Sequence, residues 1–280
     1  MRKPDWLKVP LPNSREFIDM RGLLDRLNLH SVCQEARCPN MGECFQSGTA
    51  TFLILGNTCT RNCRYCNVRH GQPDAPDEEE PTRLAAAVKA LGLRYSVITS
   101  VTRDDLPDGG ASFFARCIEL LRKETPDCRV EVLIPDLKGN WKALERILAS
   151  GPHTLNHNVE VVPRLFGKLR PQGSYTLSLE LLRQAGKGVH KALTKSGFMI
   201  GFGETRDDIL SLMDDLAAVS CSRLTIGQYL QPSIDHWPVS KFYEPEEFDR
   251  FRQEALRRGF RHVVSGPLVR SSYQAAKYAE

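Results

Sequence analysis

The sequence of 280 residues has no apolar run long enough to cross a bilayer, which argues against a membrane protein. Residues 1–10 hold no apolar signal core and no amphipathic segment rich in Arg and Ser, so they do not resemble a targeting peptide. We therefore expect a cytoplasmic location and no membrane partner. A processed organellar protein would carry the same kind of start.

A strong charge imbalance is also missing. Lys and Arg number 38 against 34 Asp and Glu, so the formal net charge is only +4. This mild excess permits an acidic partner but does not call for nucleic acid. The chain has no internal repeat and no complete Gly-x-Gly-x-x-Gly motif, so neither a repeat fold nor the dinucleotide fingerprint is predicted.

Cysteine, by contrast, is abundant and unevenly placed. Six of the nine cysteines fall in two triplets between Cys33 and Cys66. A disulfide framework is unexpected in a cytosolic chain of this size. The remaining three lie in apolar helix or strand patterns and are predicted to be buried structural thiols: Cys117, Cys128 and Cys221.

The second triplet along the chain has the spacing Cys59-x3-Cys63-x2-Cys66. On a tight loop or helical turn these offsets place three sulfurs on one side. Three thiolates suit a four-iron, four-sulfur cluster that keeps one iron free to bind a small molecule. Structural zinc is the alternative, but it normally takes four protein ligands, and His70 is the only local candidate for the fourth.

The first triplet has the spacing Cys33-x4-Cys38-x5-Cys44, and Pro39 and Gly42 predict a loop rather than a helix. For this triplet alone, a zinc site with a distant fourth ligand stays open. Neither triplet shows the paired Cys-x2-Cys knuckles of a zinc ribbon. Two different triplets so close together favour two iron–sulfur clusters.

Strand and helix patterns alternate from residue 50 onward. Such alternation predicts an α/β fold with a parallel sheet and right-handed crossovers. Six units rather than eight indicate a partial (β/α)6 TIM-type barrel. The predicted strands are 50–56, 96–101, 129–135, 154–160, 197–202 and 223–229. The predicted helices are 82–91, 111–123, 141–149, 176–185, 206–218 and 245–258.

Three regions are expected along the chain. Residues 1–48 form an N-terminal extension with the first triplet, and Asn13 or Ser14 caps a helix that ends near Leu29. Residues 49–260 form the partial barrel, and residues 261–280 form a C-terminal extension. The composition of residues 265–273 predicts a loop that caps a terminal helix, with a serine as the N-cap.

Polar residues recur just beyond the predicted strands. In barrels of parallel strands the active site lies at that end. Any one of these groups could be a helix cap or a surface pair, but their recurrence favours a functional site. They are residues 102–105, 136–138, 156–160, 195–196, 203–205 and 228–231, of which 195–196 precede their strand.

The Cys59–Cys66 motif resembles that of the radical S-adenosylmethionine (SAM) enzymes. In those enzymes the amino and carboxylate groups of SAM chelate the open iron, and the aromatic residue before the third cysteine lies near adenine. Here that residue is Tyr65. Both triplets, taken with the tail Arg-Ser-Ser-Tyr, are similar to the lipoyl synthase family from about Val32 to Ala275.

The resemblance implies roles for particular residues. Asn158 and Glu160 resemble the pair that holds the SAM ribose in the related biotin synthase. Ser272, with Ser271 as second choice, would be the unusual fourth ligand of an auxiliary four-iron cluster. The cysteines of that cluster would be Cys33, Cys38 and Cys44, and those of the SAM-cleaving cluster Cys59, Cys63 and Cys66. Candidate contacts for the methionine carboxylate are Arg103, Arg170 and Lys195.

The resemblance also implies a reaction. Unactivated carbons offer no acidic proton, so a 5′-deoxyadenosyl radical would start the chemistry and allow two sulfur atoms to be inserted at carbons six and eight of a protein-bound octanoyl-lysine. The auxiliary cluster would donate the sulfur, and an oxygen ligand such as Ser272 could leave as that cluster breaks up. Expected partners are octanoylated lipoyl domains of 2-oxoacid dehydrogenases or the glycine-cleavage H protein, with ferredoxin or flavodoxin as electron donor.

Two other functions compete with this interpretation. One is a different radical SAM enzyme that inserts sulfur or transfers methylthio groups, which the N-terminal triplet and the Ser-Ser tail disfavour. The other is a zinc-stabilised nucleic-acid-binding protein, which would contain zinc and ignore SAM.

Overall fold

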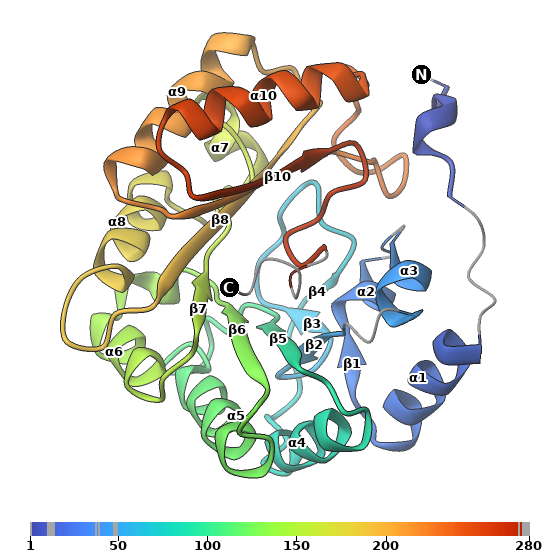
Figure 1. The fold of residues 1–280 in the computed structure, drawn as a ribbon, viewed down its shortest axis with the longest axis vertical. Coiled ribbons are helices and arrows are strands. Elements are labelled where there is room, and N and C mark those ends of the chain that lie inside the picture. The colour runs from blue at the N-terminus through green and yellow to red at the C-terminus, as the bar shows by residue number, and fades with distance from the viewer. Residues whose placement is uncertain are drawn as a thin grey trace.

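The computed structural model describes residues 2–9, 15–36, 38, 40–46, 50–273 and 275. In this part of the chain an eight-stranded sheet has the order β1-β2-β5-β6-β7-β8-β9-β10, and a separate two-stranded sheet pairs β3 with β4. Strand β1 is antiparallel to β2, whereas every other neighbouring pair in the large sheet is parallel. The sheet curves around a central space, and most helices cover its outer side (Figure 1).

The strands are β1 His30–Ser31, β2 Thr51–Ile54, β3 Thr58–Cys59, β4 Arg69–His70, β5 Tyr95–Ser100, β6 Arg129–Leu133, β7 Thr154–Asn156, β8 Leu193–Ile200, β9 Arg223–Gln228 and β10 His262–Gly266. The helices are α1 Arg15–Arg26, α2 Val32–Glu35, α3 Met41–Gln46, α4 Glu80–Ala90, α5 Ala111–Glu124, α6 Trp141–Ala149, α7 Pro163–Leu169, α8 Tyr175–Ala185, α9 Arg206–Ala218 and α10 Pro245–Arg257, with short 3-10 turns at Asp5–Leu7 and Leu137–Gly139.

The predicted α/β fold is confirmed, and all six predicted strand-and-helix units are present. The inner strands β2, β5 and β9 are buried on both faces, as parallel strands covered by helices must be, and apolar residues such as Phe52, Ile98 and Ile226 form their centres. Each helix turns an apolar stripe toward the sheet; Leu84, Ile118 and Leu212 are fully buried. The large sheet does not close between its edge strands β1 and β10, as expected of a partial barrel.

Several local predictions were wrong. The stretch around Cys33 to Cys44 is not a continuous loop, because it contains α2 and α3. Ser31 caps α2, since its hydroxyl accepts a hydrogen bond from the Cys33 amide at 3.1 Å. Lys195 and Ser196 lie inside β8 rather than before it. Helix α7 was not predicted, and the cap residues proposed for α1, Asn13 and Ser14, lie outside the described residues.

A seventh parallel strand, β10, was also missed. Its residues pair with β9 from His262 opposite Arg223 to Gly266 opposite Gly227. The loop predicted for 265–273 therefore begins two residues later than expected, and the described residues from 267 to 273 form turns. A five-residue strand with only two buried or half-buried valines has too weak a pattern to be recognised alone.

The chain beyond β10 returns to the space inside the sheet, beside α2 and α3 (Figure 1). The Asn40 side-chain amide donates a hydrogen bond to the Leu268 carbonyl at 2.5 Å, and the Tyr273 hydroxyl donates to Glu43 at 3.1 Å. Further along, Ala275 packs against Tyr95 and Val97 of β5. The fold thus brings the two terminal extensions together inside the barrel.

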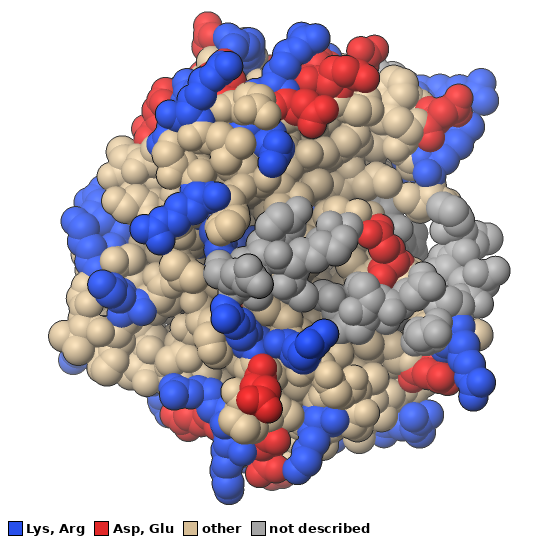
Figure 2. Space-filling model, in the orientation of Figure 1, with Lys and Arg blue, Asp and Glu red and all other residues tan. Residues whose placement is uncertain are grey.

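Charged side chains of both signs occur on the face in Figure 2, whose left side carries mainly Lys and Arg. Blue and red side chains alternate along the upper and lower rims of the face in Figure 2, in keeping with the small net charge. Within the described residues, no helix combines the length and the apolar character that a membrane span requires.

Candidate active site

The loop that carries Cys59, Cys63 and Cys66 is anchored by Arg61. Its guanidinium makes paired hydrogen bonds of 2.7–2.9 Å to Asp104, which follows β5, and of 2.7 Å to Asp136, which follows β6. Although burial acts in the opposite direction, Arg61 lowers the pKa of Asp136. Two of the polar residues predicted at strand ends therefore hold the cysteine loop rather than contact a substrate.

The surroundings of the three thiols suit a bound cluster. The Cys59 sulfur accepts hydrogen bonds from the backbone amides of Arg61 at 3.4 Å and Thr102 at 3.3 Å. Burial raises the pKa of Cys63, and raises that of Cys66 to about 12; in both cases a charge on Cys59 raises it further. Thiols with raised pKa values release their protons when a cationic centre binds them. This donor set therefore fits an iron–sulfur cluster.

Among the described residues, no three His, Cys, Asp or Glu side chains already form a site for a single metal ion. A four-iron cluster binds each cysteine through a different iron, so its ligands stand farther apart than those of one zinc ion.

Tyr65 is held in place by other aromatic rings. Its ring makes an edge contact with Phe202 at 6.1 Å between centroids, and Phe202 stacks on Tyr229 at 4.2 Å. Burial raises the pKa of Tyr65 well above its usual value, so the phenol stays neutral. An aromatic surface of fixed orientation next to Cys66 is suited to an adenine ring.

Asn158 and Glu160 lie just beyond β7 and contact each other. The Asn158 amide donates to Glu160 at 3.0 Å, while its own Oδ1 is buried without a hydrogen-bond partner. Glu160 has a positive φ of 68°, a strained conformation that is often kept for function. Burial raises the pKa of Glu160. The Asn158 oxygen is a buried acceptor without a partner, and it lies next to a carboxylate carried on a strained backbone. This combination indicates a place for a polar ligand.

Of the three candidates for a carboxylate contact, only Arg170 lies in this region. It donates to the carbonyl of Asn158 at 3.0 Å, and its Nε is buried without a partner. Burial raises the pKa of Tyr65 and of Glu160, and the positive charge of Arg170 opposes this rise. Arg103 is paired with Asp105. Lys195 instead forms a buried ion pair of 2.9 Å with Glu131, near the start of β8. Arg103 and Lys195 are therefore committed to structural pairs.

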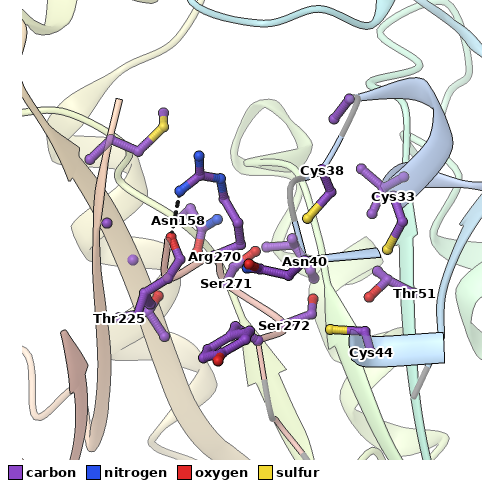
Figure 3. Close-up of a pocket in the computed structure, with 18 of the residues that line it drawn as sticks. Cys33, Cys38, Asn40, Cys44, Thr51, Asn158, Thr225, Arg270, Ser271 and Ser272 are labelled. Carbon is purple, nitrogen blue, oxygen red and sulfur yellow. Dashed lines mark hydrogen bonds between the residues drawn. The ribbon is translucent and has the colours of Figure 1, made fainter. Parts of the chain in front are cut away.

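The first triplet and the C-terminal tail line one cavity of about 220 Å³. Its wall includes Cys33, Cys38, Cys44, Ser271, Ser272, Arg270, Asn158 and Glu160. The three sulfurs point into this space, with Ser272 on the side of Cys44 and Ser271 on the side of Arg270 (Figure 3). The same cavity thus connects the predicted ligands of one cluster with the predicted ribose contacts of SAM.

The thiols of this cavity influence one another strongly. The hydrogen bond between Cys33 and Cys38 lowers the pKa of Cys38 to about 6, and the positive charge of Arg270 acts in the same direction. The same hydrogen bond, together with burial, raises the pKa of Cys33 well above its usual value. Three thiols that share a cavity with a guanidinium and two hydroxyl groups fit a cluster with three sulfur ligands and one oxygen ligand.

Comparison with known proteins identifies the family. The model of the radical SAM superfamily matches residues 53–216, and that of the N-terminal domain of lipoyl synthase matches residues 1–38. The lipoyl synthase of Roseiflexus sp. (strain RS-1) is 55% identical over 274 residues, which covers 98% of this chain and 91% of that protein. The lipoyl synthase of Desulfotalea psychrophila is 54% identical and covers 98% and 92%.

The chain belongs to the lipoyl synthase family.

Solved structures support the fold alone. Methylornithine synthase superimposes with a TM-score of 0.56 at 14% identity, covering 89% of this chain and 81% of that one. Coproporphyrinogen III oxidase from Escherichia coli gives 0.53 at 13%, covering 75% and 51%. As a member of the lipoyl synthase family, the chain is a radical SAM sulfurtransferase that uses a four-iron, four-sulfur cluster and SAM and acts on a protein-bound octanoyl group.

Sequence reasoning missed some residues that build this lipoyl synthase site. Arg61 stands between two predicted cluster ligands, and a charged residue at such a position could have signalled an anchor. Arg270 precedes the two predicted serine ligands and could have been noted as a cation near thiolates. Gly227 had no signal at all, because its importance depends on which backbone packs against it.

Gly227 determines how closely the tail of this lipoyl synthase approaches β9. A Cβ atom at this position would lie 2.2 Å from the Val269 carbonyl oxygen, so Gly227→Ala must displace the tail that carries Ser272. We expect less iron per chain and less sulfur insertion, with SAM cleavage retained. Iron analysis and assay of 5′-deoxyadenosine test this. Gly167→Ala is the control, since nothing lies within 4 Å of its added methyl; equal iron content in both variants would contradict the prediction.

Proposed function

We propose that this member of the lipoyl synthase family inserts two sulfur atoms at carbons six and eight of an octanoyl chain held on a lysine of a carrier protein. The observation that carries the proposal is the single cavity lined by the first cysteine triplet, by Ser272 and by Asn158 and Glu160. Such a cavity allows one substrate chain to face both a bound SAM and a source of sulfur.

Cys59, Cys63 and Cys66 would hold the cluster that cleaves SAM. When bound, that cluster would supply a 5′-deoxyadenosyl radical from SAM, which removes hydrogen from carbons that have no acidic proton. The protein's part is to orient SAM: Asn158 and Glu160 would hold the ribose hydroxyls, and Tyr65 would lie against the adenine. Arg170 is suited to the methionine carboxylate, because its buried Nε lacks a partner.

Cys33, Cys38 and Cys44 would hold a second four-iron cluster, with Ser272 as fourth ligand. This cluster is the sulfur donor, and so a substrate of the reaction. Iron clusters favour thiolate, so a serine oxygen is the ligand expected to leave first. Ser272 is preferred to Ser271 on the family motif. This assignment divides the chain into an extension 1–48, a barrel 49–260 and an extension 261–280.

The expected carriers are lipoyl domains of 2-oxoacid dehydrogenases or the glycine-cleavage H protein. A cytoplasmic ferredoxin or flavodoxin would supply electrons, because each SAM cleavage consumes one. Neither nucleic acid nor a membrane has a part in this reaction.

An octanoyl-lysine peptide tests the proposed reaction directly. With SAM and a reductant, the anaerobically purified protein is expected to convert it to the lipoyl peptide, with the monothiolated peptide as intermediate. Mass spectrometry of the peptide measures both products. Failure to form any thiolated peptide by a preparation that cleaves SAM would overturn the proposal.

Substitutions at the two serines test the oxygen ligand. Ser272→Ala is expected to destabilise the second cluster and to stop sulfur insertion, since one iron loses its protein ligand. Ser272→Cys is expected to keep the cluster but slow sulfur release, because thiolate binds iron more firmly. Ser271→Ala is the matched control. Wild-type activity and iron content in both Ser272 variants would refute the assignment.

A further inference from the structure

The loop after β9 contacts the cysteine loop at two points. His236 Nε2 lies 3.0 Å from the carbonyl oxygen of Cys66, a residue 170 positions earlier in the chain. The adjacent backbone amide of Trp237 donates to the Arg64 carbonyl at 3.0 Å. Two consecutive residues thus contact the segment that contains the last predicted cluster ligand.

Further hydrogen bonds hold the loop after β9 in this position. The Trp237 carbonyl accepts a hydrogen bond of 2.7 Å from the Tyr229 hydroxyl, and the Trp237 indole donates to the Phe202 carbonyl at 3.2 Å. The Gln231 side chain donates to the His236 carbonyl at 3.0 Å. The loop is therefore tied to the ends of β8 and β9 before it reaches the cysteines.

The hydrogen bonds determine the tautomer of His236. A carbonyl oxygen can only accept, so Nε2 must carry the proton that it donates to Cys66. Nδ1 lies 2.8 Å from the Ser233 hydroxyl, which can donate to it when the ring is neutral. Ser233 thus orients the ring in the way that outer residues orient the ligands of metal sites.

Two other backbone groups hold Cys66, one at its amide and one at its sulfur, which has a hydrogen bond with the backbone of Val68. Its amide is used within the motif, donating to the Cys63 carbonyl at 3.0 Å. Its carbonyl marks the point at which the chain leaves the motif toward β4. A donor at this carbonyl limits rotation of the Cys66 peptide, and with it the direction of the sulfur.

We infer that His236 is a positioning residue of the SAM-cleaving centre, which holds Cys66 through its main-chain carbonyl while Ser233 holds the imidazole. The inference rests on the proposed assignment of Cys59, Cys63 and Cys66 to the cluster that binds SAM. It adds to that site a residue that is 170 positions from Cys66 in the sequence and that acts on the reaction only through Cys66.

Two amide variants separate a positioning role from simple filling of space. The amide nitrogen of glutamine can occupy the place of Nε2 and donate to Cys66, whereas that of asparagine corresponds to Nδ1 and does not reach. His236→Gln should therefore rescue what His236→Asn loses. Ile234→Ala is the control in the same loop, because Ile234 is 91% exposed.

The test uses the holoenzyme, the formation of 5′-deoxyadenosine, and the electron paramagnetic resonance (EPR) signal of the reduced cluster with and without SAM. For His236→Asn we expect about tenfold slower formation and a weaker change of the signal on adding SAM. His236→Gln and Ile234→Ala should stay within about twofold of the wild type, with Ser233→Ala between the two groups. Urea unfolding of the metal-free variants checks that each is folded.

The possible failures are distinct. A wild-type rate and signal in His236→Asn, or equal impairment in the Gln and Asn variants, would overturn the role of His236 alone. A SAM-responsive signal that survives Cys66→Ala would overturn the cluster assignment, and the inference with it.

Discussion

Cys38→Ala is expected to abolish sulfur insertion while SAM cleavage continues. Cys38 lines the cavity with Ser272, in contact with Cys33 and near Arg270, and has no part in the Cys59–Cys66 loop. Its loss removes one ligand of the second cluster, so iron should fall from about eight to about four per chain. The product 5′-deoxyadenosine should still form, without any thiolated peptide.

The opposite result is expected for Cys63→Ala. Cys63 is a proposed ligand of the cluster that cleaves SAM. Its loss should therefore stop SAM cleavage, and with it the sulfur insertion that depends on the radical. Cys128→Ala serves as the control, since Cys128 is buried outside both triplets. Iron, 5′-deoxyadenosine and thiolated peptide are measured on the same preparations. If Cys38→Ala loses as much SAM cleavage as Cys63→Ala, the two triplets do not have the separate roles that we propose.

Arg61→Met is expected to have the second large effect. The Arg61 side chain is 4% exposed and is shared by Asp104 and Asp136. Its removal leaves the buried Asp136 without its cation, and leaves Asp104 with only the more distant Lys138 at 3.9 Å. Breaking a buried ion pair from one side costs about 3–5 kcal/mol in the free energy of unfolding. Arg61→Lys should recover only part, because an ammonium cannot make two forked pairs. Binding of the SAM-cleaving cluster should fall with stability.

Urea unfolding of the metal-free protein and iron binding measure this effect. Asp136→Asn should cost more than Asp104→Asn, because Asp136 is 2% exposed and Asp104 is 20% exposed. Arg164→Ala is the control: its pair with Asp208 is at the surface and should contribute little to the free energy of unfolding. The anchoring role is refuted if Arg61→Met changes the free energy of unfolding as little as Arg164→Ala does.

Much of the fold could be predicted because its signals are local. The run of buried residues in β5 and the amphipathic pattern of α5 are each contained in one segment, and both were located to within two residues. Strand β10 was missed because its pattern is short and its stability comes from pairing with β9. Helices α2 and α3 were missed because four and six residues are too few for a periodic signal.

The sequence predicts the ligands of the site but not the residues that hold them in place. The two cysteine spacings, together with the family resemblance carried by the Arg-Ser-Ser-Tyr tail, predict the cluster ligands, and that assignment stays a prediction. Arg61 was overlooked because its partners Asp104 and Asp136 follow different strands. Lys195 was placed before its strand because the start of β8 was predicted too late. Its partner Glu131 lies on β6, two strands away in the sheet, so no local pattern indicated the ion pair.

The sequence by itself determined the cysteine triplets, the six alternating strand-and-helix units of the barrel, and the family resemblance. Only the tertiary structure decided that the tail returns to the cavity of the first triplet, that Arg61 meets two aspartates, and that His236 reaches Cys66. The physical reason is that such contacts join residues from 43 to 230 positions apart. Their geometry follows from strand register and packing, which no local pattern of residues contains.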